Sequence, residues 1–126
     1  MLSAIDHLVV TVHDISRAVD FYTRVLGLEA RYSDAGRVDL MLGDMAFRLH
    51  QADTDASPKA DAPTPGSLDL CFKSLLPLDE IKQHLDTLNI AIELGPVERR
   101  GATGQIESLY LRDPDGNLIE ICRPKR

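Results

Sequence analysis

Apolar and polar residues alternate along several short runs of this chain, and that alternation is typical of half-buried strands. In residues 5–12, Leu8, Val10 and Val12 share one side of the predicted strand, whereas His7 lies on the other. Residues 17–26 differ, because their apolar side chains recur at the spacing of a helix, and Gly27 follows as the expected end of that helix.

The same order of elements occurs twice, although the two halves show no obvious repeat in letters. The first half predicts a strand, a helix and then strands over 28–33, 37–42 and 45–50. The second half predicts a strand over 67–72, a helix opening at Pro77, a third element over 90–94, and strands over 106–112 and 117–122 joined by a tight turn at 113–116.

This order predicts an α+β fold of two βαβββ modules, forming a curved mixed sheet with the helices outside. We expect a single domain, with modules over residues 1–51 and 66–126 and a linker over 52–65 that is rich in Asp, Ala, Ser, Thr and Pro. Residues 95–104, rich in Gly and charge, are expected to form a loop.

The composition of the chain limits the classes of partner that we expect it to bind. The 126 residues carry a net charge of −6 and contain no apolar run long enough to span a membrane, so we expect neither nucleic acid nor membrane as a partner. The N-terminus lacks a signal-peptide pattern, and Cys71 and Cys122 fall inside strand-like runs. Both are interpreted as small, buried, reduced thiols of a cytoplasmic protein. By strand parity they face the same side as Asp69 and Glu120, where they are softer alternatives as metal ligands.

Three residues carry the strongest chemical signal: His7, His50 and Glu120. Each falls in a strand-like run, on the side that also carries small or polar residues. Two imidazoles and a carboxylate inside a sheet are costly to bury without compensation. A divalent metal ion is the simplest compensation, and this donor set suits Zn, Ni, Co, Mn or Fe.

Several motifs identify a family. These motifs are spread over nearly the whole chain. The chain opens with I-D-H-L-V-V-T-V-H-D-I and F-Y-T-R-V-L-G-L, and it closes with Y-L-R-D-P-D-G-N-L-I-E-I. The middle pieces are R-L-H-Q, P-G-S-L-D-L-C and G-P-V-E-R-R-G-A-T-G. The sequence resembles the vicinal oxygen chelate superfamily of glyoxalases, fosfomycin-resistance thiol transferases, bleomycin-binding proteins and extradiol dioxygenases. Within it, the chain is most similar to a subfamily of small glyoxalase-domain proteins, which implies the glyoxalase/bleomycin-resistance type of fold.

The resemblance implies that metal ligands come from the first and last strand of each module. Carried over, these positions are His7, His50 and Glu120, which leave open coordination positions for substrate. The fourth position departs from the pattern, since Ser67 stands where bacterial glyoxalases carry histidine. Asp69, two residues on and facing the same way, is the candidate substitute, directly or through water.

Arginines near such a metal favour an anionic substrate. Arg48 shares a strand face with His50, and Arg99 and Arg100 lie in the 95–104 loop, which is expected to close over the cavity as a lid. The candidate substrate-binding residues are Arg48, Ser67, Arg99, Arg100, Ser108 and Tyr110.

The resemblance implies a metal-dependent, glyoxalase-like lyase or isomerase, with Glu120 as the catalytic base, Asp69 as its backup, and glutathione or another thiol as a candidate cosubstrate. The alternatives are an Fe(II) extradiol-type ring-cleaving dioxygenase, a non-enzymatic drug-binding resistance protein, and a fosfomycin-type thiol transferase. A homodimer with shared sites is expected, in which one subunit provides His7 and His50 and the other provides Glu120.

Overall fold

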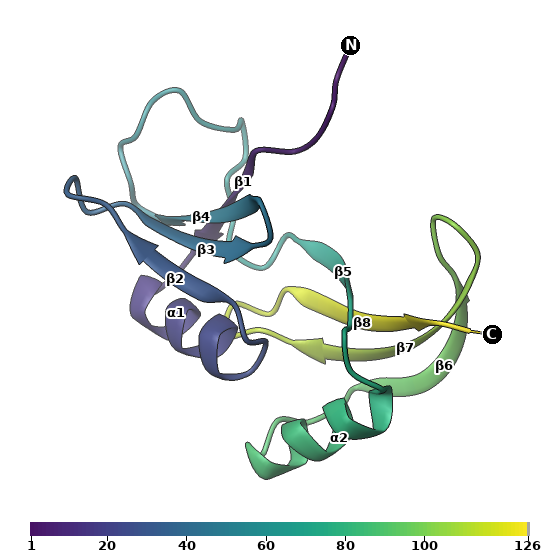
Figure 1. Ribbon diagram of the computed structural model, residues 1–126. Coiled ribbons are helices and arrows are strands. Elements are labelled where there is room, and N and C mark those ends of the chain that lie inside the picture. The colour runs from purple at the N-terminus through teal and green to yellow at the C-terminus, as the bar shows by residue number, and fades with distance from the viewer. Residues whose placement is uncertain (126) are drawn as a thin grey trace. The chain divides into compact units, whose positions relative to one another are not determined.

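The computed structural model describes residues 1–125, and the chain divides into two compact units, Met1–Ser67 and Leu68–Arg126 (Figure 1). Each unit contains one helix and one four-stranded mixed sheet. The two βαβββ modules predicted from the sequence are therefore confirmed.

The first unit has the strand order β1-β4-β3-β2. β1 pairs with β4 in parallel, and the other two pairings are antiparallel. This arrangement needs a crossover between β1 and β2, and the helix provides it. The elements of the unit are β1 His7–Val12, α1 Ile15–Arg24, β2 Glu29–Tyr32, β3 Val38–Leu42 and β4 Met45–Gln51.

α1 forms where its sequence signals predict it. The Asp14 side chain accepts a hydrogen bond of 3.2 Å from the backbone N–H of Arg17 and caps the first turn. Gly27 follows the helix with a φ of +77°, a conformation that glycine adopts without strain. The helix buries Ala18, Phe21 and Tyr22, at the predicted helical spacing.

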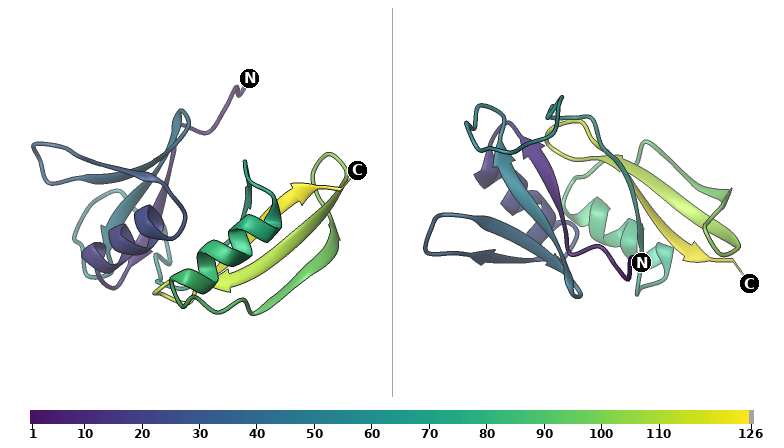
Figure 2. Two further views of the ribbon diagram at one scale, coloured as in Figure 1. Left: turned by 60° about the horizontal axis from the view of Figure 1, so that its bottom comes forward. Right: turned by 90° about the horizontal axis from the view of Figure 1, so that it is seen from above.

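The second unit repeats this topology, with the strand order β5-β8-β7-β6 and a parallel β5–β8 pair. α2 lies across one face of the sheet (Figure 2), and its Leu78 and Leu85 are buried. The strands contribute Leu109, Leu111, Ile119 and Ile121 to the same core. The elements are β5 Asp69–Lys73, α2 Leu78–Thr87, β6 Leu94–Arg100, β7 Gln105–Arg112 and β8 Leu118–Pro124.

One expected loop is a strand. The prediction of a loop over 95–104 was wrong, because β6 runs from Leu94 to Arg100 and leaves only 101–104 as a connection to β7. The third element expected over 90–94 likewise begins only at Leu94. β6 is an edge strand with an irregular register between Leu94 and Val97, around Pro96. Edge strands and bulges are the places in a sheet that tolerate proline and dense charge.

Gly95 allows the close approach of β6 to β7. Its φ is +111°, and a Cβ atom at this position would lie 2.4 Å from the carbonyl oxygen of Ser108. Any side chain here would therefore push the two strands apart.

The predicted turn between β7 and β8 is confirmed, and side chains reinforce it. The Asp113 carboxylate accepts hydrogen bonds from the backbone N–H of Asp115 and of Asn117, both at 2.9 Å. The Asn117 side chain accepts a 2.8 Å hydrogen bond from the backbone N–H of Leu68. The turn thereby fixes the start of β5 against β8.

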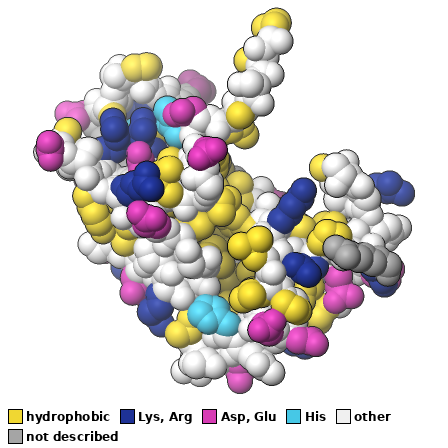
Figure 3. Space-filling model, in the orientation of Figure 1, with side chains coloured by type: hydrophobic (Ala, Val, Ile, Leu, Met, Phe, Trp, Pro, Cys, Tyr) yellow, Lys and Arg dark blue, Asp and Glu magenta, His cyan; other side chains and the backbone are white. Residues whose placement is uncertain are grey.

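None of the helices within residues 1–125 is long and apolar enough to cross a membrane. Acidic and basic side chains are interspersed on the face shown in Figure 3, rather than separated by sign.

Candidate functional site

The face of the second sheet opposite α2 brings several polar side chains together. Glu120 on β8 is paired in register with Cys71 on β5 and with Tyr110 on β7. Residues paired in register point to the same side of a sheet. The three side chains therefore form a row across the middle of this face.

Ser108 fixes the carboxylate of Glu120. Its hydroxyl donates a hydrogen bond of 2.5 Å to Oε2 of Glu120, and the Ser108 residue is completely buried. Hydrogen bonds from a hydroxyl to a carboxylate are among the strong ones. The interaction engages one carboxylate oxygen and leaves Oε1 to meet a ligand.

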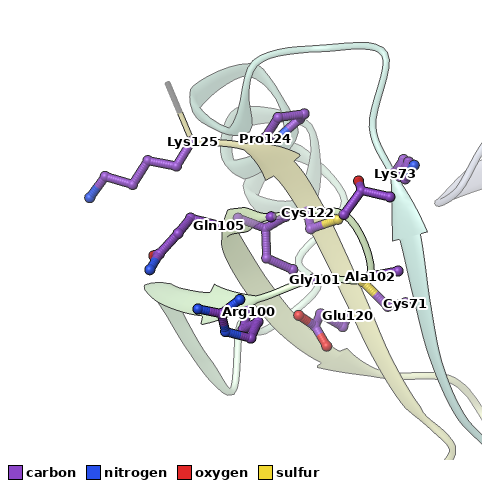
Figure 4. Close-up of a pocket in the computed structure, with 13 residues that line it drawn as sticks. Cys71, Lys73, Arg100, Gly101, Ala102, Gln105, Glu120, Cys122, Pro124 and Lys125 are labelled. Carbon is purple, nitrogen blue, oxygen red and sulfur yellow. The ribbon is translucent and has the colours of Figure 1, made fainter.

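A pocket of about 470 Å³ opens beside this carboxylate (Figure 4). Its size is within the range of small-molecule sites. Of the residues proposed from the sequence, it includes Glu120 and Arg100 but not Arg99, Ser108 or Tyr110. The lining residues are Cys71, Lys73, Arg100, Gly101, Ala102, Thr103, Gly104, Gln105, Ile106, Glu120, Cys122, Pro124 and Lys125.

Lys73 was missed as a pocket residue, whereas strand parity with Asp69 and Glu120 had placed both cysteines on this side. The signal for Lys73 was available, because Asp69, Cys71 and Lys73 are two residues apart on β5 and therefore share one face. The expectation that both thiols are buried was wrong for Cys71, which is exposed on an edge strand, whereas Cys122 is buried. Both cysteines are free thiols.

The Cys71 thiol is held in its protonated form. Although the residue as a whole is exposed, partial burial of its thiol group raises the pKa of Cys71 to about 12, and hydrogen bonding and charge repulsion involving Cys122 and Glu120 add to the shift. A protonated thiol is a poor nucleophile. Cys71 is therefore a weak hydrogen-bond donor beside Glu120 rather than a nucleophile.

Tyr110 and Arg99 form a separate contact on the same face. The Tyr110 hydroxyl accepts a 3.1 Å hydrogen bond from Nε of Arg99, whose guanidinium carbon lies 5.6 Å from the centre of the tyrosine ring. Arg99 therefore belongs to a strand-borne cation–π pair. The prediction that Arg99 and Arg100 lie in a loop that closes as a lid was wrong, because both residues belong to β6.

In the first unit, Arg48 forms a two-pronged ion pair with Asp39. Its Nε and Nη2 lie 2.9 and 3.2 Å from the two carboxylate oxygens. The hydrogen bond from Arg48 is the main cause that lowers the pKa of Asp39, and the charges of Arg48 and Arg37 act in the same direction. Most of the charge of Arg48 is thus balanced within the protein.

His7 lies between a carboxylate and this guanidinium. Its Nδ1 donates a 2.8 Å hydrogen bond to Asp6, and its Nε2 accepts one of 3.3 Å from Nη1 of Arg48. Both ring nitrogens are therefore engaged within the protein.

His7 and His50 lie at different levels of the first sheet. His7 is opposite Ala46 and His50 is opposite Thr11, so they are four residues apart along the parallel pair. Such a separation is roughly 13 Å. Arg48 lies between these levels, and guanidinium groups are not metal ligands.

The structure therefore does not bring the two imidazoles side by side within this unit. Among residues 1–125, no cluster of three or more His, Cys, Asp or Glu is arranged to hold a metal ion. Glu120 belongs to the other unit, so the ligand set His7, His50 and Glu120 stays a prediction.

The remaining candidates, Ser67 and Asp69, lie outside the pocket lining. The Ser67 hydroxyl donates a 2.7 Å hydrogen bond to the backbone oxygen of Thr64. Asp69 pairs with Leu118 and is exposed on the same face as Cys71. A role for Asp69 as a backup base, or as a ligand, stays a prediction.

Comparisons with known proteins agree with this architecture. Virulence protein STM3117 of Salmonella typhimurium is 49% identical over 123 residues, covering 98% of this chain and 85% of that protein. Its crystal structure superimposes with a TM-score of 0.95 over 99% of both chains.

Two further similar proteins are a glyoxalase domain-containing protein and a lactoylglutathione lyase. Glyoxalase domain-containing protein RDO1 of Mycosarcoma maydis is 45% identical over 118 residues, covering 94% of this chain and 66% of that protein. The structure of lactoylglutathione lyase from Agrobacterium tumefaciens is 28% identical, with a TM-score of 0.74 over 98% of this chain and 95% of that one.

The sequence also matches a family model across residues 4–121. That range includes both βαβββ modules, and the match confirms the resemblance inferred from the motifs. The chain belongs to the Glyoxalase/Bleomycin resistance protein/Dioxygenase superfamily.

Proposed function

We propose that this protein is a glyoxalase-like lyase or isomerase that moves a proton between neighbouring carbons of a small, oxygen-rich substrate, with Glu120 as the acid–base group. The observation that supports this most strongly is the Glu120 carboxylate, which lines the pocket while one of its oxygens is fixed by Ser108. Positioned carboxylates are common general bases.

Membership of the superfamily supports an enzymatic function. The superfamily contains enzymes such as lactoylglutathione lyase, and its members typically bind a divalent metal, bind small molecules and often form dimers. An isomerisation of this kind needs one base that removes a proton and later returns it, and a single carboxylate can perform both steps.

In the proposed reaction, Oε1 of Glu120 accepts a proton from a carbon that bears a hydroxyl group. The electron pair of the broken C–H bond forms a C=C bond to the adjacent carbonyl carbon, and the carbonyl oxygen becomes the anionic oxygen of an enediolate. The hydroxyl proton passes to that oxygen, which becomes the new hydroxyl group. The protonated Glu120 then returns its proton to the neighbouring carbon, and the carbonyl re-forms at the carbon that was first deprotonated. Ser108 keeps the carboxylate in place during both transfers.

A divalent ion held by His7, His50 and Glu120 remains part of the prediction, as does a thiol cosubstrate such as glutathione. Such an ion would act as a Lewis acid toward substrate oxygens. The structure does not bring His7 and His50 side by side within their unit, so the steps above use only the residues of the second unit.

The experiment is an assay with methylglyoxal and glutathione in D₂O, using protein reconstituted separately with Zn, Ni, Co, Mn or Fe(II). Turnover by the wild-type protein, lost in Glu120→Gln, is the expected result. The absence of turnover and of proton exchange with every metal would overturn the assignment. Oxygen uptake with catechols and Fe(II) would instead support the ring-cleaving alternative.

A further inference from the structure

Apolar side chains continue the pocket of the second unit from Glu120 toward the end of β8. Cys122 and Pro124 follow Glu120 at intervals of two residues, so they lie on the same face of the sheet, here called the pocket face (Figure 4). Ile106 on β7 pairs in register with Pro124, and both line the pocket. The levels of Glu120 and Pro124 are roughly 13 Å apart along the strand. The pocket face thus presents a carboxylate at one end and an apolar surface at the other.

Several polar side chains of the lining start from the other face of the sheet, which α2 covers. Arg100 pairs in register with Gln105, and Gln105 alternates along β7 with Ile106. Lys125 alternates with Pro124 in the same way, and its backbone N–H still donates to the carbonyl oxygen of Gln105. These three polar side chains therefore approach the pocket from its rim rather than from the pocket face.

The short connection over 101–104 lies against the apolar end of the pocket. Its Gly101 packs on Ile106, because a Cβ atom at position 101 would lie 3.0 Å from Cγ2 of Ile106. The backbone N–H of Gly101 donates a 2.7 Å hydrogen bond to the carbonyl oxygen of Gly104, which keeps the connection compact. Ile106 is half-buried and lines the pocket, so part of its side chain is left to meet a ligand.

An apolar wall beside one carboxylate matches a ligand with one polar end and one apolar end. Apolar surface gains free energy when it leaves water, whereas a polar group buried there without a partner loses free energy. Besides Glu120, the charged side chain that the pocket face contributes to the lining is Lys73, which is exposed on the edge strand β5. The apolar end of the pocket face therefore favours an uncharged group.

We propose that the pocket of the second unit binds a substrate with an uncharged apolar tail, which extends from Glu120 over Cys122 to Ile106. The substrate class is thus a carbonyl compound that carries an aliphatic or aromatic group longer than methyl. The reaction at the polar end rests on the proposed function of Glu120, whereas the contact with the tail depends only on the lining residues. Ile106 is the residue that determines the preference for long tails.

The test is an NMR titration of the full-length protein, labelled with ¹³C in its alanine and isoleucine methyl groups, with butanol, hexanol and octanol. The expected result is saturable shifts of the Ala102 and Ile106 methyl signals, with an affinity that rises about threefold to fourfold for each added methylene group. Nuclear Overhauser contacts should join the terminal methyl group of octanol to Ile106. Hexanediol, with a hydroxyl group at both ends, should bind about tenfold more weakly than hexanol.

Ile106→Thr should weaken octanol binding by about fivefold to tenfold and leave butanol binding nearly unchanged, since only the longer tail reaches this residue. Ile5→Thr is the matched control, because it replaces an exposed isoleucine outside the pocket lining. Circular dichroism verifies that each variant is folded, and Ile106→Val, with a loss of about threefold, replaces a variant that is not. Equal binding of hexanol and hexanediol, an affinity independent of chain length, or equal effects of Ile106→Thr and Ile5→Thr would overturn the proposal.

Glu120→Gln separates this proposal from the proposed function. Octanol binding that is retained in Glu120→Gln supports the contact with the tail, even if the wild-type protein exchanges no proton. Proton exchange by a wild-type protein that binds neither hexanol nor octanol would leave Glu120 as the base and refute the contact with the tail. Light scattering tests the other occupant of this surface. Subunits that dissociate when octanol is added would assign the apolar surface to an interface between two copies of the chain and overturn the proposal.

Discussion

Ser108 on β7 and Glu120 on β8 are joined across the strand pair by a hydrogen bond of 2.5 Å. Their backbone registers are two residues apart, since Ser108 pairs with Cys122 and Tyr110 pairs with Glu120. A completely buried hydroxyl thus orients a carboxylate that lines a pocket. This relationship leads to the first prediction.

Ser108→Ala should lower kcat about tenfold with a small change in KM, because the carboxylate loses the group that orients it. It should also cost about 1–2 kcal/mol of unfolding free energy, as expected for a lost hydrogen bond to a charged group. Glu120→Gln should lower kcat by about a hundredfold or more. Steady-state kinetics measure the loss of kcat, and urea unfolding measures the loss of stability. The control is Thr103→Val, which changes another residue of the pocket lining. An equal loss of activity in Thr103→Val would contradict the role of Ser108 in orienting Glu120.

Cys71 should react slowly with thiol reagents despite its exposure. A pKa of about 12 leaves far less thiolate at pH 8 than an ordinary cysteine has. Labelling should therefore be about a thousandfold slower than for a free thiol. Protein unfolded in guanidinium is the control, and rapid labelling of the native protein that disappears in Cys71→Ser would refute this prediction.

The raised pKa of Cys71 should also make the free energy of unfolding fall at alkaline pH. Because the pKa of Cys71 is raised from 9.0 to about 12, its contribution is fully present below pH 9 and is lost as the pH rises toward 12. Cys71→Ser should therefore lose less stability than the wild-type protein across this window. Urea unfolding at several pH values measures the difference, and parallel curves for the two proteins would show that ionisation of the Cys71 thiol does not cause this fall.

The Arg48–Asp39 pair should contribute to stability at neutral pH and not in acid. The lowered pKa of Asp39 means that this contribution is present above its ordinary pKa of 3.8 and is lost as the pH falls through the lowered value. Arg48→Met should destabilise the protein by about 1 kcal/mol at pH 7 and by less in strong acid. Arg31→Met, which removes the more exposed pair with Glu29, is the control and should have a smaller effect.

Metal content is a direct test of the predicted ligand set. Protein purified without chelators should contain a stoichiometric divalent metal, and Glu120→Ala or His7→Ala should lose it, if the three residues share one ion. Elemental analysis measures this content. Equal content in His50→Ala and in the wild-type protein would remove His50 from the ligand set.

The homodimer with shared sites predicts complementation. Light scattering should report a dimer, and a mixture of inactive His7→Ala and Glu120→Ala subunits should recover about a quarter of the wild-type activity, since half of the random dimers would contain one intact site. Each variant alone should remain inactive. A monomer that binds metal stoichiometrically would contradict the shared site.

Most of the fold could be predicted from the alternation of apolar residues and from the turn signals. The helix ending at Gly27 and the turn at 113–116 are local signals, and both are confirmed. β6 was missed because Gly95, Pro96 and three charged residues resemble a loop when they are judged locally. This segment is a strand because it pairs with β7, and that pairing cannot be recognised from the segment's own residues.

The candidate site was predictable in part, for the same reason. Face parity placed Glu120 and Cys71 correctly, since alternation is a local property of a strand. The level of His50 relative to His7 depends on the register between β1 and β4, which the sequence does not state.

Gly95 lies on the edge strand β6 and affects the position of Ser108 without lining the pocket. A methyl group there would collide with the carbonyl of Ser108, whose hydroxyl orients the reacting carboxylate. In a saturation-mutagenesis screen for activity, position 95 should therefore tolerate almost no replacement, although it borders no ligand. Attempts to adapt this scaffold to new substrates should leave that residue fixed and vary the pocket lining instead.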